Sequence, residues 1–182
     1  MLVKKVASDK ITSMKPLLFL LFLILIGGCI STTQLQGPVT GGVFFPPKGE
    51  ETVAIVKELD KAQNSILVQG YSFFPAPVTQ ALVSAQKRGV NVQILMDDSS
   101  LSKQSTVIDI LAKAGIPIKL DTAPAIAQSK VMIIDGETVI TESPKFTQSG
   151  ENLLVIRHKA MAEKYIKTWK EHAGYSKPYV GR

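Results

Sequence analysis

The residues of this sequence with the clearest chemical potential lie between positions 127 and 135, which read AQSKVMIID. The apolar run from 131 to 134 predicts a β-strand, and residues two apart on a strand share a face. Gln128 and Lys130 are therefore expected to point the same way at the mouth of this strand, which Asp135 ends. Such a lysine is placed to bind a phosphate group, but the same spacing also fits an ordinary surface lysine. Spacing alone does not choose between these interpretations.

The chain has two histidines, His158 and His172, and imidazole is the side chain that most readily exchanges a proton near pH 7. His158 follows a predicted strand and starts the last predicted helix, where a capping or surface role is ordinary. His172 lies within that helix. Neither histidine has the strand-mouth position of Lys130, so neither is expected to be catalytic.

Other polar and aromatic residues are weaker candidates. Asp97 and Asp98 could bind a cation, but adjacent residues of an extended chain point to opposite faces, so a turn is the favoured interpretation. Tyr71, Phe73 and Phe74 could stack on nucleic-acid bases, although the core or a subunit contact suits them better. None of these residues outweighs the segment around Lys130.

The hydrophobic pattern alternates between helix and strand along most of the chain. The predicted helices cover 50–64, 78–88, 102–114 and 159–172, and the predicted strands cover 65–74, 90–96, 116–120, 130–135, 138–141 and 152–157. Gly136 lies where two of these strands would form a hairpin. The pattern predicts a single α/β domain in which a mixed β-sheet is flanked by helices.

The segment from Gln128 onward resembles the phospholipase D superfamily, in particular its small Nuc-type bacterial endonucleases. The motif of that family is His-x-Lys, four residues, Asp, then six residues and Gly-Ser-x-Asn. The matching positions here read Gln128, Lys130, Asp135 and then Glu142-Ser143-Pro144-Lys145. The likeness includes the segments 65–74, 81–92, 114–117 and 151–156 and runs from about Val43 to about Tyr175. It implies a phospholipase D-like fold.

The resemblance also implies a chemistry that needs no metal and no cofactor. Two histidines, one from each of two motifs, act on a phosphodiester: one attacks phosphorus and the other protonates the leaving oxygen. Lysine, serine and asparagine hold the phosphate oxygens. Lys130, Asp135, Ser143 and Glu151 keep family positions, and Lys130 and Ser143 would bind the phosphate. A chain with one motif must pair with another, so a symmetric homodimer is implied.

This sequence departs from the family motif at its most important position. Gln128 stands at the position of the nucleophilic histidine, Glu142 replaces glycine, and Lys145 replaces asparagine. A neutral carboxamide is a poor nucleophile and cannot shuttle protons near pH 7. Impaired hydrolysis is therefore predicted. The alternatives are an active metal-independent phosphodiesterase that cleaves DNA or phospholipid, and a non-catalytic protein that binds phosphodiesters or supports an active partner.

The amino-terminal segment resembles a bacterial lipoprotein signal. Residues 17–26 form an unbroken apolar run, shorter than the about 20 residues that a membrane-spanning helix needs. The sequence LIGGC follows the lipobox pattern, in which Cys29, the one cysteine of the chain, would be lipidated. Residues 1–29 are then a signal peptide, 30–42 a flexible tether and 43–182 the phospholipase D-like domain. Translation from Met1 and from Met14 both remain open.

Charge and composition set looser limits. The chain has 21 basic and 15 acidic residues, of which four lysines and one aspartate precede position 29. The remaining part is only mildly basic, which suits nucleic acid or phospholipid without requiring either. A single cysteine excludes an intrachain disulfide and a zinc site built on several thiolates. The predicted location is the cell envelope, with the domain outside the cytoplasm and attached to the membrane by lipid.

Overall fold

An eight-stranded β-sheet forms the centre of the chain. The structure is a computed structural model that describes residues 37–45, 49–70, 74–121, 130–142 and 152–180. In spatial order the strands are β1 (Thr40–Phe44), β7 (Leu153–Arg157), β6 (Thr138–Glu142), β5 (Val131–Ile134), β2 (Ser65–Gln69), β3 (Asn91–Asp97), β4 (Ile118–Asp121) and β8 (Lys177–Pro178). The strands β2, β3 and β4 are parallel, and every other neighbouring pair is antiparallel. The predicted mixed sheet is therefore confirmed.

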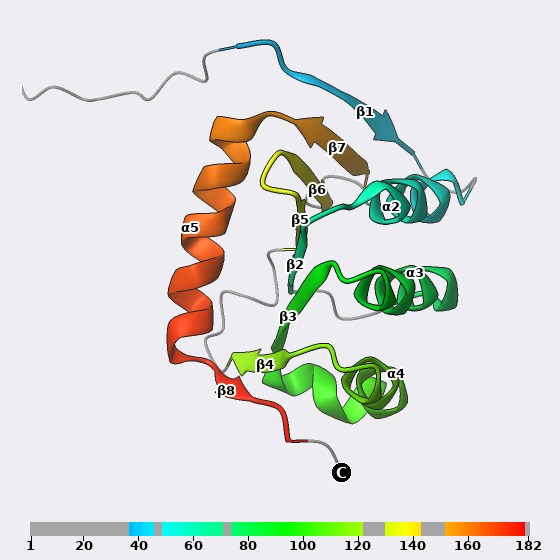
Figure 1. Ribbon diagram of the computed structural model, residues 1–182, viewed down its shortest axis with the longest axis vertical. Coiled ribbons are helices and arrows are strands. Elements are labelled where there is room, and N and C mark those ends of the chain that lie inside the picture. The colour runs from blue at the N-terminus through cyan, green and yellow to red at the C-terminus, as the bar shows by residue number, and fades with distance from the viewer. Residues whose placement is uncertain (1–36, 46–48, 71–73, 122–129, 143–151, 181–182) are drawn as a thin grey trace, which may run out of the picture. The chain divides into compact units, whose positions relative to one another are not determined.

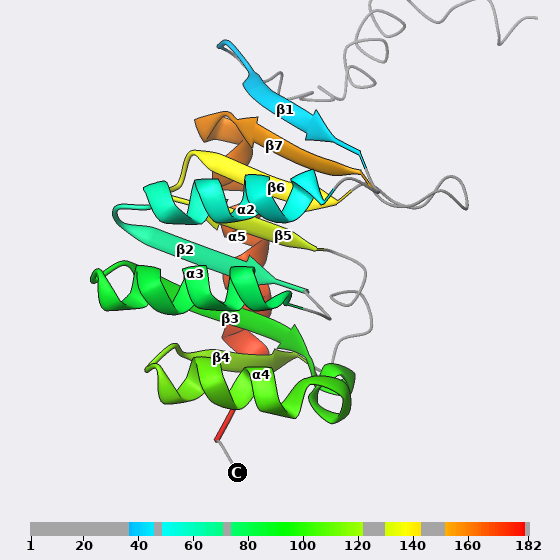
Figure 2. The same cartoon turned by 90° about the vertical axis from the view of Figure 1, so that its right-hand side faces the viewer.

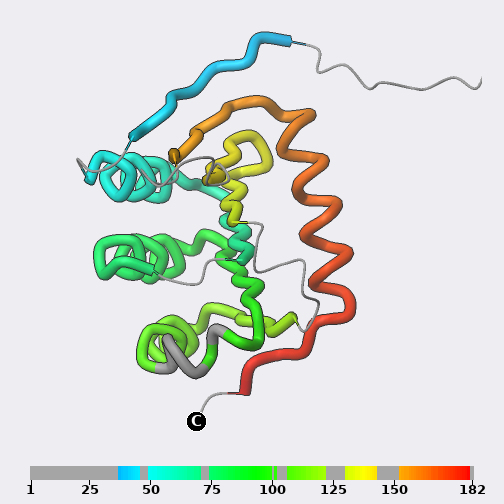
Figure 3. Tube along the Cα trace, turned by 180° about the vertical axis from the view of Figure 1, so that it is seen from behind, coloured from blue at the N-terminus to red at the C-terminus, as the bar shows by residue number. Residues whose placement is uncertain are grey.

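Helices cover both faces of this sheet. Three helices, α2 (Glu50–Lys61), α3 (Ala76–Lys87) and α4 (Leu101–Lys113), lie side by side on one face (Figures 1 and 2). A single long helix, α5 (Lys159–Tyr175), crosses the other face (Figure 3). The predicted α/β class with helices on both sides of the sheet is the observed one.

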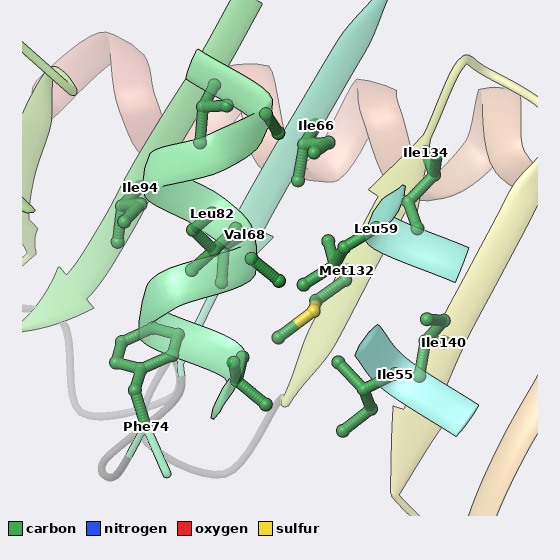
Figure 4. Packing of buried hydrophobic residues seen from close by; sticks show 14 of the residues in the cluster. Ile55, Leu59, Ile66, Val68, Phe74, Leu82, Ile94, Met132, Ile134 and Ile140 are labelled. Carbon is green, nitrogen blue, oxygen red and sulfur yellow. The ribbon is translucent and has the colours of Figure 1, made fainter. Parts of the chain in front are cut away.

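Each face of the sheet has its own hydrophobic core. On the side of α2, α3 and α4, fully buried side chains such as Leu59, Leu82 and Met132 interlock between helices and strands (Figure 4). On the other side, Trp169 of α5 packs against the sheet and donates a hydrogen bond from Nε1 to the carbonyl oxygen of Val68 at 3.0 Å. Burial of about 25 cal/mol per Å² of apolar surface makes these two cores the main stabilising contribution.

The ends of the strands lie along two opposite borders of the sheet, and the word edge refers to these borders and not to the outer strands. We call the edge at which β2, β3 and β4 end the carboxyl edge, and the opposite one the amino edge. The antiparallel strand β5 starts at the carboxyl edge, because Val131 pairs with Gln69 of β2 and with Thr141 of β6. Ligands of open α/β sheets bind at the carboxyl ends of parallel strands. A ligand-binding site is therefore expected at the carboxyl edge.

The turn between β5 and β6 lies at the amino edge and has the predicted hairpin form. Asp135 and Gly136 have φ values of 52° and 69°, which a type I′ turn requires at both central positions. The amide of Glu137 closes the turn on the carbonyl oxygen of Ile134 at 3.1 Å. Glycine suits the second position because it has no Cβ to strain.

Several element bounds differ from those expected from the sequence. Strand β2 ends at Gln69, and α5 continues to Tyr175. Strand β1 begins at Thr40, within the range 30–42 assigned to a tether, and pairs with β7. Its glycines read as flexible linker residues, but a Cβ at Gly41 would collide with the carbonyl oxygen of Val155. Glycine is thus needed there for close strand approach.

Within the described residues no helix is both long enough and apolar enough to cross a membrane.

Candidate functional site

Lys130 lies at the carboxyl edge of the sheet, immediately before β5. Its carbonyl oxygen accepts a hydrogen bond of 2.9 Å from the hydroxyl of Thr141, which ties the start of β5 to the end of β6. Side chains alternate along a strand, so Lys130 continues the row of Met132, whose side chain faces α2, α3 and α4. The structure therefore gives Lys130 the strand-mouth position that the sequence predicted.

Glu142 is the partner of Lys130 on the neighbouring strand. Met132 pairs with Ile140 in the β5–β6 register, so the next positions on the same face are Lys130 and Glu142. Lys130 Nζ donates a hydrogen bond to Glu142 Oε2 at 2.6 Å, and the two side chains are 26% and 23% exposed. The pair is partly shielded from water at a short distance, which makes it a charge-assisted hydrogen bond.

Asp135 lies at the opposite end of β5 from Lys130. The two are five positions apart along the chain, or about 16 Å at the usual rise per residue of a strand. The carboxylate of Asp135 accepts three backbone hydrogen bonds, from Gln63 at 2.9 Å, Asn64 at 2.7 Å and Ser65 at 2.9 Å. These residues link α2 to β2. Asp135 therefore holds two segments of the fold together, and the structure does not bring it to Lys130.

The pKa of the Asp135 carboxyl reflects this role. Burial raises the pKa, but the three backbone N–H donors outweigh burial and hold it below the ordinary value of 3.8. The amide of Asp135 in turn donates to the carbonyl oxygen of Ser65 at 2.9 Å. The aspartate is thus ionised and saturated with donors at neutral pH, which suits a structural residue.

The two histidines have local structural roles. His158 is the N-cap of α5, where Nδ1 accepts a hydrogen bond from the amide of Met161 at 3.2 Å, as the expected capping role requires. His172 lies 2.7 Å from the fully buried carboxylate of Asp121, at the end of β4. Because Lys119 and Asp121 alternate with the buried Ile118, this contact lies on the α5 face of the sheet, opposite to the side that Lys130 faces.

The weaker sequence candidates are also accounted for. Asp97 caps the short 3₁₀ helix at 98–100 and accepts a hydrogen bond from the amide of Ser99 at 2.9 Å, which confirms the predicted turn. Phe74 is 1% exposed and belongs to the core. The lysines of α5 are exposed to solvent: Lys159, Lys164, Lys167 and Lys170. Tyr71 and Phe73 lie outside the described residues.

The sequence did not reveal a second ionic cluster, which lies at the amino edge. Glu58 of α2 is nearly buried and pairs with Arg157 of β7 at 2.6 Å and with Lys61 at 2.9 Å. Burial raises the pKa of the Glu58 carboxyl, but its two cationic partners bring it below the ordinary value of 4.5. A cleft of about 410 Å³ beside this cluster is lined by β1, α2 and β7. The helical spacing of Glu58 and Lys61 was the only sequence signal for it.

Four of the predicted functional residues lie outside the described residues: Gln128, Ser143, Glu151 and the lipidation candidate Cys29. Among the residues that the structure describes, no group of three or more His, Cys, Asp or Glu side chains is arranged to hold a metal ion. Lys130 and Glu142 are therefore the described part of the candidate site. The chemistry that they support is the binding of an oxyanion to an ammonium group.

Comparisons with known proteins identify the family to which the chain is similar. Residues 55–173 match the family described as cardiolipin synthase, PLD-like domain. A protein named phospholipase D from Rickettsia prowazekii is 39% identical over 144 residues, which are 76% of this chain and 70% of the relative. A mitochondrial cardiolipin hydrolase of Xenopus tropicalis is 24% identical over 121 residues and is matched over 58% of its length.

Solved structures show the same arrangement of strands and helices. Nuc from Salmonella typhimurium, a phospholipase D family member, aligns with a TM-score of 0.68 at 30% identity, covering 79% of this chain and all of Nuc. NucT from Helicobacter pylori aligns with a TM-score of 0.63 at 18% identity, covering 78% of this chain and all of NucT. The second likeness concerns the fold alone.

Proposed function

Because this chain belongs to the phospholipase D superfamily, we propose that it binds phosphodiester groups at the carboxyl edge through Lys130, with hydrolysis impaired by Gln128. The ligand carries a phosphodiester of either DNA or phospholipid, the two sources that the family resemblance leaves open. Ser143 contributes a second hydrogen bond to the phosphate in this proposal. An active, metal-independent phosphodiesterase is the alternative that the experiment below tests.

The observation that supports the proposal is the geometry of Lys130. Its ammonium group lies at the carboxyl edge and already holds a carboxylate oxygen at 2.6 Å. A phosphate oxygen is held at a similar distance by the same kind of charge-assisted bond. With only 26% of its side chain exposed, Lys130 is also more shielded from water than a typical surface lysine. An oxyanion therefore finds a preformed donor here.

Impaired hydrolysis rests on the chemistry of Gln128. Cleavage by the family mechanism needs a nitrogen that attacks phosphorus and a second one that protonates the leaving oxygen. A carboxamide nitrogen has no available lone pair for attack and does not titrate near pH 7. Neither described histidine substitutes for it, because His158 caps α5 and His172 pairs with Asp121 on the other face.

The test is a cleavage and binding assay on the full chain in detergent, with EDTA present. The substrates are plasmid DNA and bis(p-nitrophenyl) phosphate, and binding is measured with dimethyl phosphate. Lys130→Ala removes the proposed ligand-binding charge. Lys113→Ala, at the exposed end of α4 near the amino edge, removes the same charge elsewhere and serves as the matched control. Gln128→His restores the histidine of the motif.

We expect binding that Lys130→Ala weakens and Lys113→Ala leaves unchanged, with no cleavage by the natural chain. Gln128→His is expected to give measurable cleavage if the remaining site is intact. Cleavage by the natural chain that depends on Lys130 would contradict the proposed impairment and support the active alternative. Equal binding by the Lys130 and Lys113 variants would exclude Lys130 as the phosphate ligand.

We also propose that two copies of the chain assemble as a homodimer, because each chain has one motif and the family chemistry uses two. A heterodimer with an active relative is the alternative, in which this chain supports its partner. Light scattering on the purified chain in detergent distinguishes the two. A stable dimer of the chain alone supports the first, and a monomer that dimerises only with an added relative supports the second.

Attachment to the membrane through lipidated Cys29 is a further proposal, motivated by the sequence LIGGC after an apolar run. Two or more acyl chains give durable attachment, because each buried CH₂ contributes about 0.8 kcal/mol. Metabolic labelling with radioactive palmitate tests this proposal. Label and membrane fractionation are expected to be lost together in Cys29→Ser. An unlabelled natural chain would exclude the lipid anchor.

A further inference from the structure

The Lys130–Glu142 pair places a carboxylate directly on the group that is proposed to hold the ligand. Lys130 immediately precedes β5 and Glu142 is the last residue of β6, and a hydrogen bond of 2.6 Å joins their side chains. Both side chains are about three-quarters shielded from water. A carboxylate oxygen and a phosphate oxygen are chemically similar acceptors for an ammonium donor, so both compete for the same hydrogen-bonding direction.

We infer that Glu142 is a specificity-determining residue that competes with anionic ligands for Lys130. This inference rests on the proposed function, since it concerns the same phosphate site. A phosphodiester that reaches Lys130 must displace the carboxylate of Glu142 or share the ammonium with it. The charge of the pair sums to zero, so the site attracts anions less than a lone lysine would. Glu142 therefore lowers affinity for every anion and does so most for ligands of high charge density.

The remaining described strand ends at the carboxyl edge reinforce this selection. Strand β3 ends in Asp97, and Asp98 follows directly. Asp97, Asp98 and Glu142 outnumber Lys130 and Lys177, the lysines at the described strand ends of that edge. Proteins that bind nucleic acid without base contacts depend on clusters of positive charge that neutralise successive phosphates. The described part of this edge instead favours a ligand with a single phosphate group over a polyanion.

A purely structural role for the pair is the competing explanation. Opposite charges that face each other across two antiparallel strands stabilise a sheet by roughly 0.2–1 kcal/mol. In that case Glu142 helps to align β5 with β6 and has no influence on a ligand. The two explanations differ in what they predict for the affinity of Lys130 for an anion once the charge of Glu142 is removed and the shape of its side chain is kept.

The experiment measures anion affinity for the full chain in detergent and for Glu142→Gln, which keeps the side-chain shape and removes the charge. The probes are dimethyl phosphate, followed by NMR titration, and a fluorescein-labelled single-stranded oligonucleotide, followed by anisotropy. Glu137→Gln is the matched control, because Glu137 is exposed on the β5–β6 turn at the amino edge and carries the same charge. Glu142→Asp shortens the carboxylate, and Lys130→Met in both backgrounds identifies the site. Thermal melts confirm that each variant is folded.

We expect Glu142→Gln to bind dimethyl phosphate about tenfold more tightly, equivalent to about 1.4 kcal/mol, with a larger gain for the oligonucleotide. The affinity of Glu142→Asp should lie between those of the natural chain and Glu142→Gln. Glu137→Gln should bind dimethyl phosphate as tightly as the natural chain does. Lys130→Met should abolish the gain in affinity. Lys130-dependent binding that Glu142→Gln does not strengthen would overturn the inference and leave the proposed function intact. No Lys130-dependent binding in any background would overturn both.

Discussion

A charged residue flanks strand β5 on each side, and the two charges have partners of different kinds. At the carboxyl edge, Lys130 is bonded to Glu142, a side chain with rotatable bonds that a ligand can displace. At the amino edge, Asp135 is bonded to three backbone amides between α2 and β2, which cannot move away without unfolding that connection. A ligand can therefore replace Glu142 as the partner of Lys130, whereas the hydrogen bonds of Asp135 hold the β5–β6 turn in place.

The family motif contains residues with two different roles, one at the proposed phosphate site and one in holding the fold together. Lys130 and Asp135 both keep positions of the family motif, yet about 16 Å of strand lies between them. A side chain that far from the phosphate site cannot touch the ligand. Retention of Asp135 therefore indicates that the fold requires it, and it says nothing about whether hydrolysis persists. The proposed binding of phosphodiesters therefore concerns the carboxyl edge.

The largest expected effect is the loss of stability when the hydrogen bonds of Asp135 at the amino edge are removed. Asp135→Ala should lower the free energy of unfolding by about 2–3 kcal/mol, because it removes a charged acceptor from three amides and places alanine at a positive φ of 52°. Asp135→Asn is the matched control, since asparagine tolerates that backbone and keeps one acceptor. Urea denaturation of both variants measures the difference. A loss below about 0.5 kcal/mol for alanine would show that the three hydrogen bonds are not structural.

The second prediction concerns pH. Asp135 has a folded-state pKa below its ordinary value of 3.8, so the unfolded chain binds its proton first as pH falls. Its contribution to stability is fully present above about pH 5 and is lost as pH falls through about 4 toward the folded-state pKa. The stability difference between the natural chain and Asp135→Asn should therefore shrink between pH 5 and pH 2.5. Urea titrations at several pH values measure it, and a difference that stays constant would contradict the assignment.

The third prediction is that the pair at the carboxyl edge matters little for folding. Lys130→Met and Glu142→Gln should each change the free energy of unfolding by less than about 1 kcal/mol, because the pair is partly exposed and screened by water. A double-mutant cycle isolates the coupling between the two side chains. Coupling well above about 1 kcal/mol would mark the pair as a folding element and weaken its role in ligand selection.

Much of the fold was predictable from local patterns. Hydrophobic periodicity located α2, α3, α4 and α5 and six of the strands, and Gly136 located the β5–β6 hairpin. Strand β1 was not predicted because its glycines resemble a linker. Gly41 is required for the close approach of β1 to Val155, which exists only in the folded sheet. The two-residue strand β8 contains a proline and has no periodicity to detect.

The candidate site was predictable only in part. The two-residue spacing placed Lys130 at a strand mouth, and the motif departure drew attention to Glu142, whose contact with Lys130 follows from the β5–β6 register. The role of Asp135 was not predictable, because its partners lie about 70 positions earlier in the chain. The pairing of Asp121 with His172 is nonlocal for the same reason. Local sequence patterns carry no information on which distant amides a carboxylate will meet.

The smallest expected effect is the energetic coupling between the two ends of β5. Asp135 and Lys130 lie about 16 Å apart, so the effects of Asp135→Asn and Lys130→Met on the free energy of unfolding should add to within about 0.5 kcal/mol. The double variant measured by urea denaturation tests this. A larger coupling would mean that β5 transmits strain between its ends. Ligand binding at Lys130 would then alter the α2–β2 connection, and the two edges could no longer be treated as independent.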